Sequence, residues 1–370
     1  MTSRPPSGVR TSEPPLSAEV ARRRRGLRTG WTTGTCASAA AKAAAQGFLT
    51  GHPPAEVEVA LPGGRRVSFP VEPAKPNRCV VVKDAGDDPD CTDGARITAE
   101  VSDSPTATTE LRAGEGVGVI TLPGLGLPVG APAINPVPRR VILAALAEVT
   151  ASPLVVTFSV PRGEEMAAET TNARLGIVGG ISLLGTTGIV RPFSTAAYRA
   201  SVVQQVDVAA AQGNRTMVLA TGHRSERAAM RLRPDLPDVC FAEVGDFTGI
   251  ALRRAASSGM DGVLWVGMAG KASKLAAGVM MTHFHRSEVD GSLLEEVARQ
   301  SGAPDTVVAA ASATNTARHF AEVCRAESCP GPLYELCRRA KAACVAHVRG
   351  ALEVEVVMVD FEGDEVMARA

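Results

Sequence analysis

Residues 174–191 read RLGIVGGISLLGTTGIVR, and this stretch lies in the middle of the 370-residue chain. It holds five glycines and two adjacent threonines between Arg174 and Arg191. A buried strand followed by a glycine-rich bend is how an α/β sheet brings backbone N–H groups close to a ligand, because side chains there would hold the ligand away. Strands and Pro/Gly-rich loops precede the stretch, whereas strands and helices alternate after it. The sequence therefore predicts a domain boundary and a pocket wall here.

Four apolar runs, each followed by a helical pattern, begin at this stretch; they are residues 175–178, 216–220, 239–244 and 262–266. This alternation predicts a small α/β domain, residues 174–290, with a four-stranded parallel sheet and right-handed crossovers. Ligands of such sheets bind beyond the carboxyl ends of the strands, where the strand order reverses. Residues 291–370 are predicted to be helical with a final strand at 352–362, which returns to one of the two sheets of the protein.

The first half of the chain has a different pattern. Residues 1–25 are rich in Pro, Ser and Arg without apolar periodicity, which predicts a disordered extension. Residues 26–173 predict an α+β domain. Within it, strands at 55–61 and 65–71 flank a Pro-Gly-Gly turn and indicate a hairpin, and a further strand is expected at 78–82.

A threonine- and glycine-rich turn runs into an alanine-rich helix within residues 26–48, GLRTGWTTGTCASAAAKAAAQGF. The hydroxyls of Thr32, Thr33 and Thr35 are suited to cap the helix start. A helix start also attracts anions, and Arg28 is adjacent. Two interpretations remain open at this point: an anion-binding turn, or an ordinary N-cap on a helix whose alanine face packs on a sheet.

Five aspartates are crowded into the loop KDAGDDPDCTDG, residues 83–94, at a spacing that does not fit a calcium-binding loop. Crowded carboxylates repel one another, so one of them is expected to have a raised pKa that suits a proton acceptor. The catalytic candidates are Asp84, Asp87 and Asp88. A solvated acidic turn is the alternative. The apolar, proline-stiffened loop 123–136 is predicted to be ordered and to line a site.

The glycine-rich loops match no standard nucleotide fingerprint. The segment GMAGKAS, residues 267–273, lacks the first glycine of a phosphate-binding loop because Trp265 stands there. A nucleotide-dependent phosphotransferase is a further hypothesis, and this segment is its only support. The glycine bend of the central stretch suits a backbone-bound ligand, and Asp246 of the same predicted domain is placed to accept from ribose hydroxyls. The cofactor-binding candidates are Gly179, Gly180, Gly185, Thr186, Thr187, Gly188 and Asp246.

The composition excludes several classes of protein. Lys and Arg number 39 and Asp and Glu number 39, so no global field attracts nucleic acid or a membrane surface. No run approaches the ~20 apolar residues of a membrane span. The eight cysteines form no CxxC pair and no trusted zinc pattern, which indicates reduced thiols in the cytoplasm and no bound metal.

Six blocks of the sequence occur in the order found in the CbiD family, which the chain resembles from about Arg28 to Gly363. The blocks are GLRTGWTTGTCASAAAKAA, VVKDAGDDPDCTDG, GEGVGVITLPGLGLPVGAPAINPVPRR, RLGIVGGISLLGTTGIV, GKASKLAAGVMMTH and NTAR. Two pairs of residues depart from the family pattern, Met268 with Ala269 and Phe284 with His285. A corrinoid-binding carrier without catalysis is the alternative that these departures leave open.

The resemblance implies an α+β domain followed by a small α/β domain. It also implies methyl transfer from S-adenosylmethionine to ring carbon one of cobalt-precorrin-5B, with cobalt present only in the substrate. Arginine and lysine side chains at the block edges, with the threonine turn, would receive the corrinoid carboxylates. The substrate-binding candidates are Arg28, Thr32, Thr33, Thr35, Lys83, Arg139 and Arg191. The expected partner is this small molecule, without nucleic acid or membrane; a homodimer is a candidate assembly.

Overall fold

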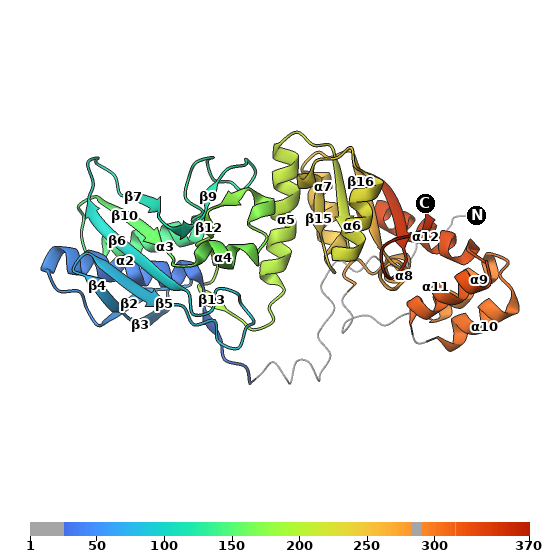
Figure 1. Ribbon diagram of the computed structural model, residues 1–370, viewed down its shortest axis with the longest axis horizontal. Helices are drawn as coiled ribbons and strands as arrows, with labels where there is room; N and C mark the ends of the chain where they lie inside the picture. Colours follow the sequence, from blue (N-terminus) through green and yellow to red (C-terminus); the bar gives the residue numbers. More distant parts are fainter. Residues whose placement is uncertain (1–25, 283–290, 315) are drawn as a thin grey trace. The chain divides into compact units, whose positions relative to one another are not determined.

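The computed structural model describes residues 26–282, 291–314 and 316–370, which form two compact units (Figure 1). The N-terminal unit ends at Thr195, and the C-terminal unit begins at Ala196. The predicted boundary before Arg174 is therefore corrected, because every strand of the central stretch pairs with a strand of the N-terminal unit. The extension predicted at residues 1–25 lies outside the described residues.

The N-terminal unit is built on a five-stranded mixed sheet with the order β4-β5-β6-β10-β7. Its strands are β1 (Gly30–Trp31), β2 (Glu56–Ala60), β3 (Arg66–Pro70), β4 (Glu72–Lys75), β5 (Arg78–Val82), β6 (Arg96–Asp103), β7 (Glu110–Ala113), β8 (Gly116–Val117), β9 (Val119–Ile120), β10 (Leu154–Ser159), β11 (Ile177–Val178), β12 (Gly180–Ile181) and β13 (Ile189–Val190). Its helices are α2 (Thr33–Thr50), α3 (Pro136–Ala147), α4 (Gly163–Ala168) and the 3₁₀ turn η1 (Ala173–Leu175). The predicted hairpin is confirmed as β2 and β3, and the strand predicted at 78–82 is β5.

The alanine-rich helix α2 lies at the centre of this unit. Every residue from Thr33 to Ala45 is buried, and the helix contacts β5 and β6 of the sheet as well as α3. Alanine side chains suit this position, because they let a helix approach packing partners on several sides at no cost in side-chain entropy. The helix begins at the Thr32 cap and ends at Gly51, whose φ of 77° permits the left-handed C-cap.

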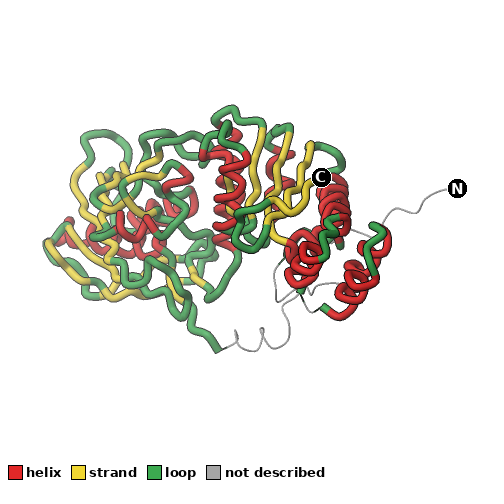
Figure 2. The backbone as a smooth tube through the Cα atoms, turned by 45° about the vertical axis from the view of Figure 1, so that its right-hand side comes forward, coloured by secondary structure: helices red, strands yellow, loops and turns green. Residues whose placement is uncertain are grey.

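The C-terminal unit holds a second five-stranded sheet with the order β15-β14-β16-β17-β18. Its elements are α5 (Ala196–Ala211), β14 (Thr216–Ala220), α6 (His223–Leu232), η2 (Asp238–Cys240), β15 (Phe241–Glu243), α7 (Thr248–Ser257), β16 (Gly262–Met268), α8 (Ala269–Ala276), α9 (Gly291–Gln300), α10 (Asp305–Ala313), α11 (Ala317–Ala326), α12 (Gly331–His347), β17 (Glu353–Val359) and β18 (Val366–Arg369). Figure 2 shows its strands among the helices that flank them.

The prediction of a four-stranded parallel sheet is wrong, because the sheet has five strands in mixed orientation and one of the predicted runs is not part of it. Four strands of this sheet, β15, β14, β16 and β17, are parallel, and β18 adds an antiparallel edge. The run at 175–178 is not among them, because its strand β11 pairs with β9 in the other unit. The C-terminal strand β17 takes the fourth parallel place beside β16 after the helix α12.

The alternation of side chains along β16 explains why helices cover both faces of this sheet. Val263 and Trp265 belong to the larger core with α5, α7 and the C-terminal helices, whereas Leu264 and Val266 pack with α6 on the other face. The indole N–H of fully buried Trp265 donates to the Thr248 hydroxyl at 3.1 Å. Strand β14 has β15 on one side and β16 on the other, so the strand order reverses between β14 and β16.

Candidate functional site

Segments that are far apart in the sequence converge in the N-terminal unit. Strand β1 of the threonine turn pairs with β13 of the central stretch, and Thr29 bridges to Gly86 of the acidic loop. The amide of Trp31 also donates to the carbonyl of Asp84 at 2.7 Å. We call residues 28–35, 83–94 and 182–193 together the loop cluster. The structure thus brings together three of the segments from which the site candidates were chosen.

The apolar loop 123–136 joins the loop cluster from another side. Ile134 bridges to Leu183, and the amide of Asn135 donates to the Leu183 carbonyl at 3.0 Å. Pro138, at the start of α3, lies so close to Gly34 that a β-carbon on Gly34 would stand 2.6 Å from the proline ring. The prediction that this loop is ordered is confirmed.

The three threonines of the turn are buried, and their hydroxyls bond within the protein. The Thr33 hydroxyl donates to the Ser182 carbonyl at 3.0 Å, and the Thr35 hydroxyl donates to the Gly188 carbonyl at 2.9 Å. Thr32 caps α2 by accepting from the Thr35 amide at 3.3 Å. These bonds fasten the helix start to the central stretch, so the N-cap interpretation is the one that the geometry favours.

The glycines of the central stretch allow close packing of backbone. A β-carbon on Gly180 would lie 2.1 Å from the carbonyl of Gly116, and one on Gly185 would lie 2.3 Å from the Thr32 hydroxyl. Gly188 is crowded in the same way by Thr35, at 2.8 Å. These three glycines therefore serve contacts between segments of the same unit rather than open space for a ligand.

The other cofactor candidates of this stretch are exposed to solvent. Gly179, Thr186 and Thr187 are exposed, and a β-carbon on Gly179 would meet nothing within 4 Å. The remaining candidate, Asp246, belongs to the C-terminal unit. The predicted cofactor set is thus divided between the two units.

Hydrogen bonds tie the carboxylates of the acidic loop to the other two segments of the loop cluster. Asp87 accepts from the Arg28 amide at 2.6 Å, and Asp88 accepts at the same distance from the amide of Phe193, whose φ is 55°. Asp84 accepts from the Arg28 guanidinium and from the Gly86 amide. Each bond holds a turn of the loop in place.

The expected raised pKa is not found at Asp84 or Asp90. The hydrogen bond from Arg28 lowers the pKa of Asp84, assisted by the bond from the Gly86 amide. Burial alone would raise the pKa of Asp90, but the charge of Lys83 and hydrogen bonds from Lys83 and Thr92 outweigh burial and lower it. Carboxyls held ionised in this way are weak proton acceptors, so charge stabilisation suits Asp84 better than general-base work.

The basic candidates of the N-terminal unit fall into two groups. Lys83 is 2% exposed and pairs with Asp90 at 2.7 Å, so its ammonium faces the protein interior. Arg28, Arg139 and Arg191 are exposed, although Arg28 already pairs with Asp84. Only these arginines remain placed to meet a ligand carboxylate.

A second group of polar residues gathers at the carboxyl ends of the strands in the C-terminal unit. The Lys271 ammonium donates to the carbonyls of Thr221 and Gly245 at 2.9 and 3.0 Å, and it lies 3.4 Å from Asp246. Asp246 also accepts from the Thr282 hydroxyl at 3.2 Å. Lys271 therefore ties together the loops after β14 and β15, and the phosphotransferase interpretation of GMAGKAS loses the lysine it needs.

Three helices begin at this edge without a side-chain cap. They are α6, α7 and α8, whose N-cap positions are Gly222, Phe247 and Met268. Helix starts leave N–H groups unpaired and carry a partial positive charge. The start of α7 is already partly occupied, because the Gly249 amide donates to the Met280 carbonyl at 3.0 Å. The starts of α6 and α8, together with Asp246, which is 24% exposed, give this edge donors for an anion and an acceptor for hydroxyls.

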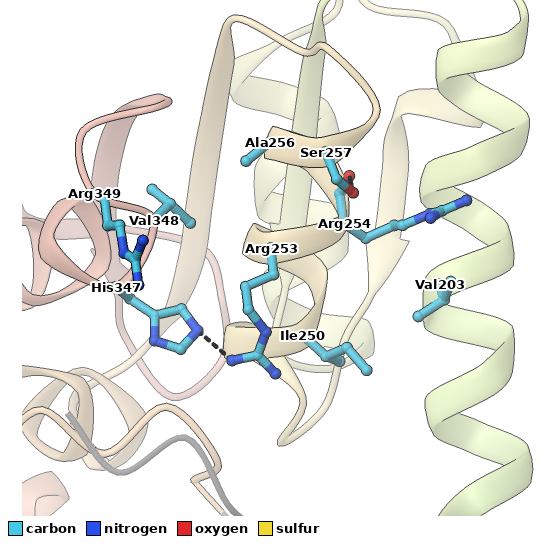
Figure 3. A pocket seen from close by; sticks show the side chains of 9 residues that line it. All are labelled: Val203, Ile250, Arg253, Arg254, Ala256, Ser257, His347, Val348 and Arg349. Carbon is cyan, nitrogen blue, oxygen red and sulfur yellow. Dashed lines mark hydrogen bonds between the residues drawn. The ribbon is translucent and has the colours of Figure 1, made fainter.

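Sequence reasoning missed a hollow of about 770 Å³ on the C-terminal unit (Figure 3). We call it the cationic groove; its walls come from α5, α7 and the end of α12, and its lining includes Val203, Ile250, Arg253, Arg254, His347 and Arg349. The adjacent arginines of α7 were the only local signal. The groove itself depends on the packing of α12 beside α7, 94 residues away in sequence from Arg253 to His347.

Metal and membrane features are not found in the described part of the chain. No group of three or more His, Cys, Asp or Glu residues there is arranged to hold a metal ion. No described helix has both the length and the apolar character that a bilayer span requires. All eight cysteines are free, and burial raises the pKa of Cys36 and Cys344 to about 12, which keeps these thiols protonated.

Comparison with known proteins gives matches over both units. The family described as CbiD matches residues 20–192, and the CbiD C-terminal domain matches residues 281–370. The chain is 57% identical over 366 residues to the cobalt-precorrin-5B C(1)-methyltransferase of Salinispora arenicola, with 96% of each chain covered. It is 58% identical over 361 residues to the protein of the same name from Rubrobacter xylanophilus, covering 95% of this chain and 93% of the relative.

A crystal structure of the cobalamin biosynthesis protein CbiD from Archaeoglobus fulgidus is also similar. Its sequence identity is 30% and its TM-score is 0.40, over 75% of this chain and 85% of that one. The relatives from Salinispora and Rubrobacter share more than half of their residues with this chain over nearly its whole length. The chain therefore belongs to the CbiD family.

Proposed function

We propose that this chain methylates ring carbon one of cobalt-precorrin-5B, with S-adenosylmethionine as methyl donor, and yields cobalt-precorrin-6A in the cobalamin pathway that inserts cobalt early. One observation carries the proposal: identities of 57% and 58% over at least 95% of the chain to two proteins named for this reaction. The match spans both units, which supports the proposal. The carrier alternative rested on Met268 and Phe284, and Phe284 lies outside the described residues.

Methyl transfer requires the protein mainly to position the two reacting carbons. The sulfonium–methyl bond breaks as the ring carbon uses an electron pair to form the new carbon–carbon bond, and S-adenosylhomocysteine leaves. Such a transfer requires the two carbons aligned at about 3–3.5 Å, and alignment supplies much of the rate. Asp84, held ionised by Arg28, suits contact with a cation. Catalytic roles for Asp84, Asp87 and Asp88 stay predictions.

The polar edge of the C-terminal sheet supports a proposal for the methyl donor. It lies at the carboxyl ends of β14 and β16, where the strand order reverses and where α/β sheets bind ligands. Asp246 would accept hydrogen bonds from the ribose hydroxyls, and the uncapped starts of α6 and α8 would receive the donor carboxylate. The central stretch is a weaker candidate, because Gly180, Gly185 and Gly188 are occupied by packing.

Incubation of the protein with cobalt-precorrin-5B and methyl-labelled S-adenosylmethionine tests the function. We expect label in the corrinoid and an equal amount of S-adenosylhomocysteine. A folded protein that binds the donor and transfers no label would end the proposal. A cytoplasmic location and a homodimer stay predictions of the sequence.

Replacing Asp246 with asparagine tests the donor site. We expect S-adenosylhomocysteine to bind roughly 10- to 100-fold more weakly by calorimetry, because hydrogen bonds to a charged acceptor contribute about 1.5–3 kcal/mol. Asp261→Asn is the matched control, since Asp261 precedes β16 at the opposite end of the sheet and pairs with Arg215 on the surface. Unchanged affinity in a folded Asp246→Asn protein would move the donor site elsewhere.

A further inference from the structure

The cationic groove concentrates guanidinium groups on one surface. Arg253 and Arg254 come from α7, and Arg349 follows the end of α12 (Figure 3). Arg254 pairs with Asp207 of α5. Within residues 26–282, 291–314 and 316–370, neither Arg253 nor Arg349 forms an ion pair with a carboxylate. Two positive charges of the groove are thus uncompensated by the described protein.

His347 adds an imidazole to the groove, and one of its two ring nitrogens has no hydrogen-bond partner among the described residues. Its Nε2 lies 2.8 Å from Arg253 Nη1 and 3.0 Å from the Gly249 carbonyl. Its Nδ1 is buried and has no hydrogen-bond partner among the described residues. Burial lowers the pKa of His347, and the nearby Arg253 charge lowers it further against the opposing bond to Gly249. The lowered pKa disfavours the protonated imidazole, so arginines are the main source of the groove's charge.

Most of the remaining lining of the groove is apolar, and Ser257 is the exception. Val203 comes from α5 and Ile250 from α7, and Val348 lies beside Arg349 (Figure 3). A volume of about 770 Å³ far exceeds a single carboxylate and is in the range of small-molecule sites. An apolar surface with guanidinium groups at its edges fits a flat, largely apolar ring that carries several carboxylates.

We propose that the cationic groove binds the carboxylate side chains of the corrinoid substrate, with Arg253 and Arg349 as the principal contacts. This inference rests on the proposed function for the identity of the ring. It assigns substrate recognition to residues of the C-terminal unit that lie outside the six sequence blocks. Guanidinium pairs carboxylates in a two-pronged geometry, so both arginines would orient the ring as well as attract it.

The test uses two probes and the full-length protein. The first probe is cobyrinic acid, a corrinoid with free carboxylate side chains, and the second is the same ring with those side chains amidated. Absorption titration of Arg253→Gln and Arg349→Gln should show cobyrinic acid binding weakened about tenfold in each, and further in the double variant. The amidated ring should bind all proteins alike. The affinity of the wild-type protein for the acid should fall as salt is raised.

Arg215→Gln is the matched control. It makes the same change in net charge, but Arg215 pairs with Asp261 and lies outside the groove lining. Its affinity for cobyrinic acid should stay within about twofold of the wild type, since an exposed charge that is already paired with a carboxylate and makes no contact with the ligand is largely screened. An equal loss in Arg215→Gln would show diffuse charge attraction and overturn the proposal. So would a wild-type protein that does not bind the acid, or a double variant that binds it unchanged.

Turnover separates this inference from the proposed function. The double variant should raise the Michaelis constant for cobalt-precorrin-5B with little change in kcat, because its groove positions the ring and does not touch the reacting bond. Methyl transfer with an unchanged Michaelis constant would refute the groove and leave the function standing. Loss of acid binding in the variants, together with no transfer by the wild type, would support the groove and refute the function.

Discussion

Replacing Gly180 with valine should unfold the N-terminal unit or lower its stability by about 3 kcal/mol or more. Gly180 pairs in parallel with Gly116, and any β-carbon at residue 180 would lie 2.1 Å from the Gly116 carbonyl carbon and oxygen. Backbone atoms cannot rotate away as a flexible side chain would. The two strands would have to separate, and the interior contacts of Ile181 and Val117 would be lost with them.

Thermal unfolding followed by circular dichroism, with the yield of soluble protein, measures this effect. Gly179→Ala is the matched control in the adjoining position, where an added β-carbon meets nothing within 4 Å. The φ of Gly179 is 88°, which is strained for alanine, so the free energy of unfolding should fall by a smaller amount, about 1–2 kcal/mol. A Gly180→Val protein that melts like the wild type but binds the methyl donor weakly would restore the cofactor role first predicted for this glycine.

Replacing Asp90 with asparagine should destabilise the N-terminal unit by about 3–5 kcal/mol, because it leaves the buried Lys83 charge without its partner. The Lys83 side chain is 1% exposed, and its ammonium lies 2.7 Å from the Asp90 carboxylate. Urea unfolding measures the loss. The double variant Lys83→Met with Asp90→Asn removes both charges and should recover a large part of the stability. Equal stability of Asp90→Asn and wild type would show that the pair contributes nothing.

The same pair gives a pH dependence with a defined sign. The folded-state pKa of Asp90 lies below the ordinary value of 3.8, so the folded protein binds fewer protons at this group than the unfolded chain. Its stabilisation is complete above that value and is lost as the pH falls through the lowered pKa. Melting temperatures of the wild type should therefore fall below pH 4 more steeply than those of Asp90→Asn. Parallel curves would contradict the lowered pKa.

Local chemistry explains which predictions from the sequence hold. A helix start at Thr33, the hairpin around Pro62 and the strand at 78–82 depend on neighbouring residues, and the structure has all three. The strand runs at 216–220 and 262–266 are likewise present as parallel neighbours. Periodicity and capping act over a few residues, so they can be read from a single chain.

Roles that depend on distant partners could not be predicted in this way. A lysine at a motif edge suggests a ligand contact, but Lys83 is buried against Asp90 by the folding of its own loop. Three threonines suggest an anion site, but the hydroxyls of Thr33 and Thr35 donate to carbonyls about 150 residues away, and Thr32 caps the helix. The side chains are chemically suited to both uses. Only their tertiary partners distinguish a structural bond from a binding group.

The sequence by itself determined that this chain belongs to the CbiD family and that an α+β part is followed by an α/β part. The tertiary structure alone decided that residues 174–191 complete the N-terminal unit, that β17 fills the fourth parallel place, and that α7 and α12 form the cationic groove. The physical reason is that strand pairing and burial are settled between segments far apart in the chain, where the spacing of residues carries no information about which partner each will meet.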